Sequence, residues 1–568
     1  MHNLGLDVQF AFRQLRKSPG FALTAVLTLA FGIGATTAIF SIVEGVLLRP
    51  LPFPDPGRLV VLSDILQGAK LSASGDAGVT APEIRAYQRG TSSFESLGAF
   101  QPNNFELSGA GAPAQINVAR LSAAIFPVLG VSPLRGRAFT QQEDDASQQV
   151  AVISYEMWHS RFHGEANILG QKILLGRNPY EIIGVMPRGF EFPLIPGLLN
   201  RSELWVPLSA TQDELSGAGA ASWNFQMVGR LKPGVSPAQA EQDAGRMAAE
   251  ITRNFPAFMS SLRIRAVVHP LEESTVAQAR PLIRILFWAV AVVLFIACAN
   301  LAGLLLVRVI HRRREIAVRI ALGATGAAVL RQTLVETLLL SVSGGLLGLI
   351  LAAAALRVGT RFLPETLPRI SSIGLDWPVV SFALSAAILT GVLCGLVPAF
   401  AASRTNVNDS LKEGGRTGSA GGGHARLRSA LVVTEIAVAL MLLIASGLLL
   451  RSFEKLRAVD IGFRVDHTLT AFYNLPQKQY STQASIDQFN DTLLRKLEQM
   501  PGAEAVGVAG QLPASGAVTS TAFLAEGYVA PRDEGLNLAW PNQVMGDYFS
   551  AEGKIGRASC RERVCLAV

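Results

Sequence analysis

The sequence is poor in charged residues and in cysteine. Only 16% of its 568 residues are charged, whereas 49% are hydrophobic, and ordinary soluble domains carry about 25% charged residues. Four cysteines are too few for a disulfide framework. Two of them, Cys298 and Cys394, lie inside apolar blocks, where a thiol usually packs as a small apolar residue. This composition predicts a membrane protein, provided that the apolar residues form long blocks.

Catalytic patterns are also missing from the sequence. It contains no G-x-x-x-x-G-K-[ST] phosphate loop, no H-E-x-x-H, no G-x-S-x-G and no cysteine–histidine cluster at zinc spacing. His159 and His163 lie four residues apart without an evident third ligand, so we interpret them as surface residues. We expect no catalytic residue, no bound metal and no cofactor. The net charge of +7 lies beside apolar blocks, which indicates membrane topology rather than nucleic-acid binding.

Five apolar blocks are long enough to cross a bilayer, which takes about 20 residues. The predicted spans are 21–48 (with an apolar part Phe21–Val43), 285–307, 333–356, 377–402 and 429–450. Two of the few charges inside them, Glu336 and Glu435, are expected near helix ends, where a carboxylate can reach headgroups or complement a helix N-terminus.

Glycines four residues apart occur in the third and fourth predicted spans. The pairs are Gly344 with Gly348 and Gly391 with Gly395. Small residues at this spacing let helix backbones approach closely, so we predict a role in helix packing. The alternative is that glycine is simply common in membrane helices.

Clusters of lysine and arginine predict the orientation, because they mark cytoplasmic ends. Basic residues precede the first span, follow the second and fill the link between the fourth and fifth. The predicted cytoplasmic segments are 1–20, 308–332 and 403–428. The predicted outside segments are 49–280, 357–376 and 451–553. We expect a multi-pass membrane protein with its N-terminus in the cytoplasm.

The large outside segment, 49–280, has the patterning of an α+β domain. Strand-like runs are followed by a helix that starts at Ser236–Pro237 and by a further strand; the runs are Val150–Ile153, Tyr180–Val185, Phe225–Leu231 and Leu262–Val268. After the fifth span the strand–helix–strand order is repeated. A strand is predicted at Thr468–Tyr473, a helix at Ser485–Met500 and a strand at Ala505–Ala509. This indicates an internal duplication with a partial second outside domain.

The most specific sequence signal lies directly after the second span. It is the run Arg312-Arg313-Arg314-Glu315-Ile316-Ala317-Val318-Arg319-Ile320-Ala321-Leu322-Gly323-Ala324. It resembles the signature of FtsX-like ABC transporter permeases. Further stretches are similar to the MacB-like periplasmic core domain: Ile153-Ser154-Tyr155, Gly184-Val185-Met186-Pro187 and Arg230-Leu231-Lys232-Pro233-Gly234. The stretches Pro19-Gly20-Phe21 and Leu48-Arg49-Pro50-Leu51-Pro52 resemble the ADOP type, orphan permeases that carry the whole unit twice.

The end of the sequence departs from that pattern. A complete ADOP-type permease would continue into three more spans, whereas Ile555–Val564 matches the translation of a sequencing adapter. We therefore interpret residues 554–568 as adapter-derived and the chain as C-terminally truncated.

The resemblance implies a permease of a bacterial inner membrane whose outside segments lie in the periplasm. Such a permease couples a separate ATPase of the MacB or LolD-like type to export or extrusion on the periplasmic side by mechanotransmission. The segment 308–332 would dock on that ATPase, and the implied coupling residues are Arg313, Arg314, Glu315, Ile316, Arg319, Leu322 and Gly323. A periplasmic adaptor or an outer-membrane channel is a further implied partner, besides the lipid bilayer. Two alternatives remain open: an FtsX-like regulator of a periplasmic enzyme, and a membrane sensor without an ATPase.

Overall fold

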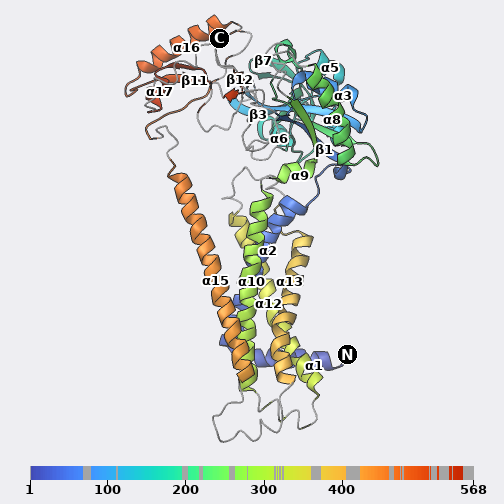
Figure 1. Ribbon diagram of the computed structural model, residues 1–568, viewed down its shortest axis with the longest axis vertical. Coiled ribbons are helices and arrows are strands. Elements are labelled where there is room, and N and C mark those ends of the chain that lie inside the picture. Colours follow the sequence, from blue (N-terminus) through green and yellow to red (C-terminus); the bar gives the residue numbers. More distant parts are fainter. Residues whose placement is uncertain are drawn as a thin grey trace. The chain divides into compact units, whose positions relative to one another are not determined.

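The structure is a computed structural model that divides into two compact units (Figure 1). Unit 1 comprises Met1–Arg49 and Val276–Val459, and unit 2 comprises Pro50–Thr275 and Asp460–Val568. The structure describes residues 2–553 except 68–77, 110–112, 195–201, 217–221, 255–262, 278, most positions of 313–324, 360–372, 404–421, 460–465, 474, 476–478, 481, 511, 513–520, 524–536 and 540–541. The tail that we interpret as adapter-derived, 554–568, lies outside the described residues.

Unit 1 is helical. It begins with α1 (His2–Lys17), whose neighbour α2 (Pro19–Val43) has a proline in its first turn and continues as the π-helix η1 (Glu44–Leu48). The other helices are α10 (Arg280–His311), α12 (Gly326–Gly359), α13 (Trp377–Ser403) and α15 (Gly422–Arg457). Within the described residues five helical stretches are long and apolar enough to cross a membrane. The five predicted spans are thereby confirmed.

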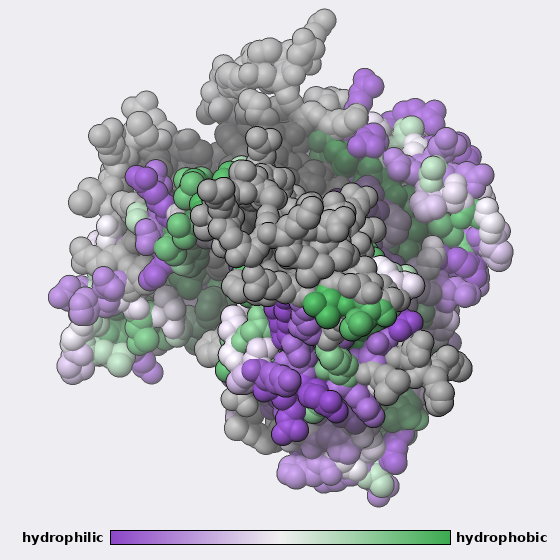
Figure 2. All heavy atoms as spheres, turned by 90° about the horizontal axis from the view of Figure 1, so that it is seen from below, coloured by the Kyte–Doolittle hydropathy of each residue, from purple (hydrophilic) through white to green (hydrophobic). Residues whose placement is uncertain are grey.

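Helix α2 packs against α10, α12 and α13, and α12 also packs against α13. Their shared core includes Leu29, Ile33, Leu301 and Leu340. Many large apolar side chains on the outer faces of these helices and of α15 remain exposed. Figure 2 shows hydrophobic residues at the surface beside hydrophilic ones. Such an exposed apolar surface suits lipid rather than water.

Unit 2 is built on one mixed sheet with the strand order β10-β1-β9-β2-β3-β8-β5-β7-β4, in which β6 pairs with β2 and β7. The strands are β1 (Leu59–Gln67), β2 (Phe94–Ser108), β3 (Ala114–Leu121), β4 (Arg135–Gly136), β5 (Val150–Ile153), β6 (Lys172–Leu175), β7 (Asn178–Val185), β8 (Leu204–Pro207), β9 (Gln226–Leu231) and β10 (Arg263–Pro270). The pairs β3–β8 and β5–β7 are parallel. The predicted α+β character of the domain is confirmed.

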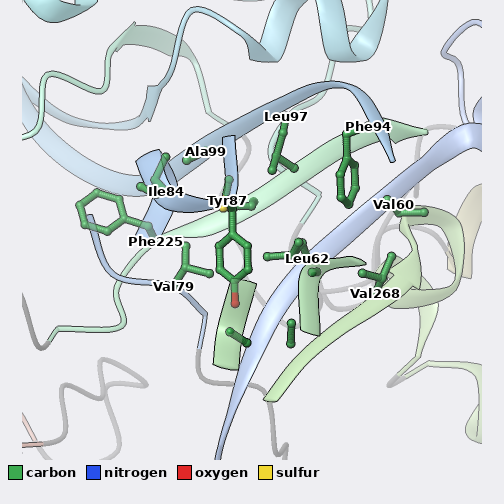
Figure 3. Close-up of a cluster of buried hydrophobic side chains, with 14 of the residues drawn as sticks. Val60, Leu62, Val79, Ile84, Tyr87, Phe94, Leu97, Ala99, Phe225 and Val268 are labelled. Atoms are coloured by element: carbon green, nitrogen blue, oxygen red, sulfur yellow. The ribbon is translucent and has the colours of Figure 1, made fainter. Parts of the chain in front are cut away.

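Short helices lie between these strands. They are η2 (Pro56–Arg58), α3 (Ala81–Gly90), α4 (Ile125–Leu129), α5 (Gln141–Asp145), α6 (Tyr155–Phe162), α7 (Gln212–Leu215), α8 (Pro237–Arg253) and α9 (Leu271–Val276). Helix α8 starts where the sequence predicts, because Ser236 accepts a hydrogen bond from the Gln239 amide in a capping box. Helices α3 and α8 pack together over β10, β1, β9 and β2, around the hydrophobic core drawn in Figure 3.

The part of unit 2 that follows the fifth span contains α16 (Gln483–Glu498), α17 (Tyr548–Ala551) and four short strands, β11 (Gly507–Ala509), β12 (Thr521–Phe523), β13 (Asn537–Ala539) and β14 (Val544–Gly546). The predicted helix and the strand ending at Ala509 are confirmed. The predicted strand Thr468–Tyr473 is wrong, because these residues form no strand and stay exposed, with Leu469 at 96%. An apolar alternating run becomes a strand only when another strand pairs with it, and no described strand does so here.

Candidate functional site

Three charged side chains meet where α10 ends and α12 begins. Arg308 Nη1 lies 2.5 Å from Glu336 Oε1, and Arg312 Nη1 lies 3.7 Å from Glu336 Oε2. The side chains of Arg308 and Glu336 are 14% and 12% exposed. We call Arg308, Arg312 and Glu336 the Arg–Glu cluster. A carboxylate this deeply placed needs a cationic partner, and here it has two.

The Arg–Glu cluster also reaches the N-terminal helices. Arg308 donates to Ser18 Oγ at 2.9 Å, and its guanidinium lies 4.5 Å from the centre of the Phe21 ring. A separate ion pair, Arg331 Nε to Asp7 Oδ2 at 2.7 Å, joins α12 to α1. Helices α1, α2, α10 and α12 are therefore tied together at this one end of unit 1.

A cavity opens beside the cluster between α1, α10 and α12. Its lining includes Phe10, Leu305, Arg312, Glu315, Gln332 and Glu336. Glu315 belongs to the predicted coupling segment and is exposed. The coupling segment and the Arg–Glu cluster thus border the same cavity.

The structure describes only part of the predicted coupling residues. Glu315 and Leu322 are described, and the Leu322 side chain is 83% exposed. Arg313, Arg314, Ile316, Arg319 and Gly323 lie outside the described residues, and so does most of the predicted amphipathic helix. The coupling role stays a prediction.

Sequence reasoning missed the pairing of Glu336. It placed this carboxylate near headgroups or a helix N-terminus, whereas the structure buries it against the two arginines. A usable signal was present: a glutamate within an apolar helix must find a partner, and arginines end the preceding span.

The four predicted packing glycines lie between helices. A Cβ on Gly344 would lie 2.7 Å from Leu29 Cβ of α2, and one on Gly348 would lie 2.9 Å from the Ala30 carbonyl oxygen. Gly391 and Gly395 of α13 lie against Ser341 and Thr337 of α12. The packing role that we predict for them rests on these approaches and is open to a substitution test.

The histidines and cysteines that the sequence analysis considered lie at the surface or between helices, as expected. His159 and His163 are exposed. Cys394 Sγ donates to the Cys298 carbonyl oxygen at 3.4 Å between α13 and α10. In the described part of the chain no group of three histidine, cysteine, aspartate or glutamate side chains is placed to hold a metal ion.

Comparison with known proteins finds two family models on the chain. Residues 22–247 match the MacB-like periplasmic core domain, and residues 287–407 match the FtsX-like permease C-terminal domain. Together the two matches cover more than half of the chain.

Curated relatives include two proteins called macrolide export ATP-binding/permease protein MacB. The one from Salmonella paratyphi A is 29% identical over 297 residues, which are 52% of this chain and 43% of that protein. The one from Escherichia coli K12 is 28% identical over 291 residues, 51% of this chain and 42% of that protein. The chain spans less than half the length of these relatives.

Among solved structures, the periplasmic region of MacB from Actinobacillus actinomycetemcomitans aligns with 43% of this chain and 97% of its own, at 15% identity and a TM-score of 0.30. The extracellular domain of the ABC-type transporter YknZ aligns with 37% of this chain and 99% of its own, at 16% identity and a TM-score of 0.28.

Since one domain model matches the sheet of unit 2 and the other matches the helices that carry the Arg–Glu cluster, the chain belongs to the FtsX-like and MacB-like ABC transporter permeases.

Proposed function

We propose that this permease takes up motion from a separate ATPase at residues 308–332 and passes it through its spans to the outside domain, where it drives export or extrusion. ATP hydrolysis is assigned to the partner, because this sequence has no phosphate loop. The basic clusters beside the spans support a cytoplasmic N-terminus.

The observation that carries the proposal is the Arg–Glu cluster with its adjoining cavity. Glu315 of the coupling segment lines the same cavity as Glu336 of α12. A force on the segment is therefore applied beside the point where α1, α2, α10 and α12 are tied together by ion pairs and hydrogen bonds. Because helices satisfy their backbone hydrogen bonds internally, they move as stiff rods.

Leu322 offers a direct test of docking. It is apolar and 83% exposed, which suits an anchor that fills a pocket of a partner. Leu322→Asp keeps every arginine of the segment, so membrane insertion is preserved. If Leu322 enters an apolar groove, a buried unpaired carboxylate there costs several kcal/mol, and we expect loss of the ATPase.

The experiment is co-purification of the tagged chain from native membranes, with mass spectrometry to identify proteins that carry nucleotide-binding motifs. Thr325→Asp is the matched control, because it places a carboxylate on another exposed residue of the segment without removing an apolar side chain. We expect ATPase recovery with the parent chain and Thr325→Asp, and none with Leu322→Asp. Equal recovery with all three, at equal membrane abundance, would contradict docking through Leu322.

A further inference from the structure

Two acidic side chains are buried together in unit 2, between β1 and α3. Asp64 of β1 is 0% exposed and Glu83 of α3 is 2% exposed. Tyr87, one helical turn after Glu83, is fully buried as well. Figure 3 shows the Tyr87 ring among Leu62, Val79 and Ile84. An ionised carboxylate in such apolar surroundings is costly unless it is paired.

Each carboxyl group has one oxygen that is bonded and one that is not. The Tyr87 hydroxyl donates to Asp64 Oδ1 at 2.6 Å, and the Thr80 amide donates to Glu83 Oε2 at 2.6 Å. Among the described residues no donor reaches Asp64 Oδ2 or Glu83 Oε1. The two carboxyl groups interact with each other. A proton held between them would satisfy both remaining oxygens.

The charged groups on the surrounding elements are paired elsewhere or exposed. On α8 and β10, Asp243 pairs with Arg246 and Glu241 with Arg265. The other titratable side chains of these two elements are exposed: Glu250, Arg253, Arg263 and His269. On α7 and β2, Glu214 binds Arg120 and Glu95 binds Arg58. On β9, Arg230 donates to the Val128 and Pro54 carbonyl oxygens. Arg85 and Arg89 of α3 itself are exposed. In this part of the described structure no cation therefore neutralises Asp64 or Glu83.

We propose that Asp64 and Glu83 form a proton-binding site that fastens α3 to β1 while it holds a proton and loosens α3 when the medium turns alkaline. The ligand is the proton itself, exchanged with the medium that bathes the outside domain. The site belongs to unit 2, whereas the Arg–Glu cluster belongs to unit 1, and it adds pH control to the outside domain.

The pKa values of Asp64 and Glu83 both lie near neutral pH. Burial raises the pKa of Asp64 to about 7, with the Tyr87 hydrogen bond opposing the rise. Burial, and next the Asp64 charge, raise the pKa of Glu83 to about 8. Burial also raises the pKa of Tyr87, so its hydroxyl remains a donor throughout.

The sign of the effect follows from these values. Both pKa values lie above the ordinary values of 3.8 and 4.5, so the closed state binds more protons than the open one. The stabilisation is complete below about pH 4 and is lost as the pH rises through about 7 and 8. Above that range two adjacent carboxylates repel each other in the core, and α3 opens more often.

Hydrogen exchange of the full chain in detergent tests the proposal. Peptides covering α3 are compared at pH 6 and pH 9 after correction for the chemical exchange rate, with peptides from α6 as an internal reference. We expect the opening equilibrium of α3 to rise at least about tenfold, with an upper limit on the order of a thousandfold from the two pKa values. An opening equilibrium that is the same at both pH values would overturn the proposal.

Asp64→Asn identifies the residues responsible. Its amide oxygen can accept from Tyr87, and its amide nitrogen can donate to Glu83, so α3 stays fastened at pH 9 and most of the pH dependence disappears. Glu143→Gln is the matched control, since this buried carboxylate is paired with Arg137 and its substitution should leave the α3 response as in the parent. A parent-like response in Asp64→Asn overturns the assignment.

Infrared difference spectra of the parent chain do not depend on any variant folding. A pH jump from 6 to 9 should remove the carbonyl band of a protonated carboxylic acid, because the pair then loses its protons. The absence of any such loss would show that the pair is already ionised at pH 6 and would overturn the proposal.

Discussion

Glu336→Gln perturbs the Arg–Glu cluster with the least change of shape. The substitution removes one negative charge and leaves an oxygen that can still accept a hydrogen bond. Arg308 and Arg312, whose side chains are 14% and 25% exposed, then lose the carboxylate that they share. Removing one partner of a buried pair costs about 3–5 kcal/mol. Because a helix end retains some access to water, we expect the lower part of that range, about 3–4 kcal/mol.

The assay is thermal unfolding of the purified chain in a mild detergent, followed with a dye that reacts with exposed thiols. Cys394 is buried in unit 1, so the dye reports the opening of the helix bundle. Cys560→Ser and Cys565→Ser remove background from the tail. We expect Glu336→Gln to lower the Tm by several degrees, and the double variant Arg308→Gln with Glu336→Gln to recover part of the loss.

Asp7→Asn is the matched control for charge removal. Its partner Arg331 is 43% exposed, and exposed pairs contribute about 0–1 kcal/mol. Glu336→Gln should therefore destabilise clearly more than Asp7→Asn. Equal Tm values for the two variants, or strictly additive effects in the double variant of Arg308 and Glu336, would refute the pairing as a source of stability.

Three further outcomes are expected. Gly348→Leu should lower the Tm of the bundle, since overpacking costs about 1–3 kcal/mol, whereas Gly303→Leu, which meets open space, should leave it unchanged. In a background without native cysteines, an impermeant thiol reagent applied to intact, outer-membrane-permeabilised cells should label Ser222→Cys and not Thr325→Cys; the reverse would invert the topology. Glu143→Gln should destabilise the outside domain at pH 7 and progressively less toward pH 2. The hydrogen bond from Arg137 lowers the pKa of Glu143 to about 2, so the stabilisation is lost as the pH falls through that value. A loss of stability that is the same at every pH would contradict this cause.

The spans could be predicted from the sequence because crossing a bilayer imposes a length that each helix meets by itself. The strand β5 and the start of α8 were also predictable, since a short apolar run and a serine–proline helix start are local signals. The Arg–Glu cluster was not, because Arg308 and Glu336 meet only when α10 packs beside α12. The same limit applies to Asp64 and Glu83, which lie on different elements and become a pair only in the folded sheet.

The contacts along α2 give the proposed coupling a mechanical route. Near its start Ser18 is tied to Arg308 of the cluster. In its middle, Gly34 packs directly against Gly348 of α12, and a Cβ added to Gly34 would lie only 2.9 Å from the Gly348 carbonyl oxygen. Toward its far end Ser41 donates to the Gly374 carbonyl oxygen at 2.7 Å, and directly after η1 Arg49 pairs with Asp376 at 3.0 Å. Close packing resists deformation, so a shift applied to α2 and α12 at the cluster moves both helices as one body. Under the proposed coupling we therefore expect the displacement to reach Arg49, the last residue of this segment of unit 1, without separate side-chain rearrangements.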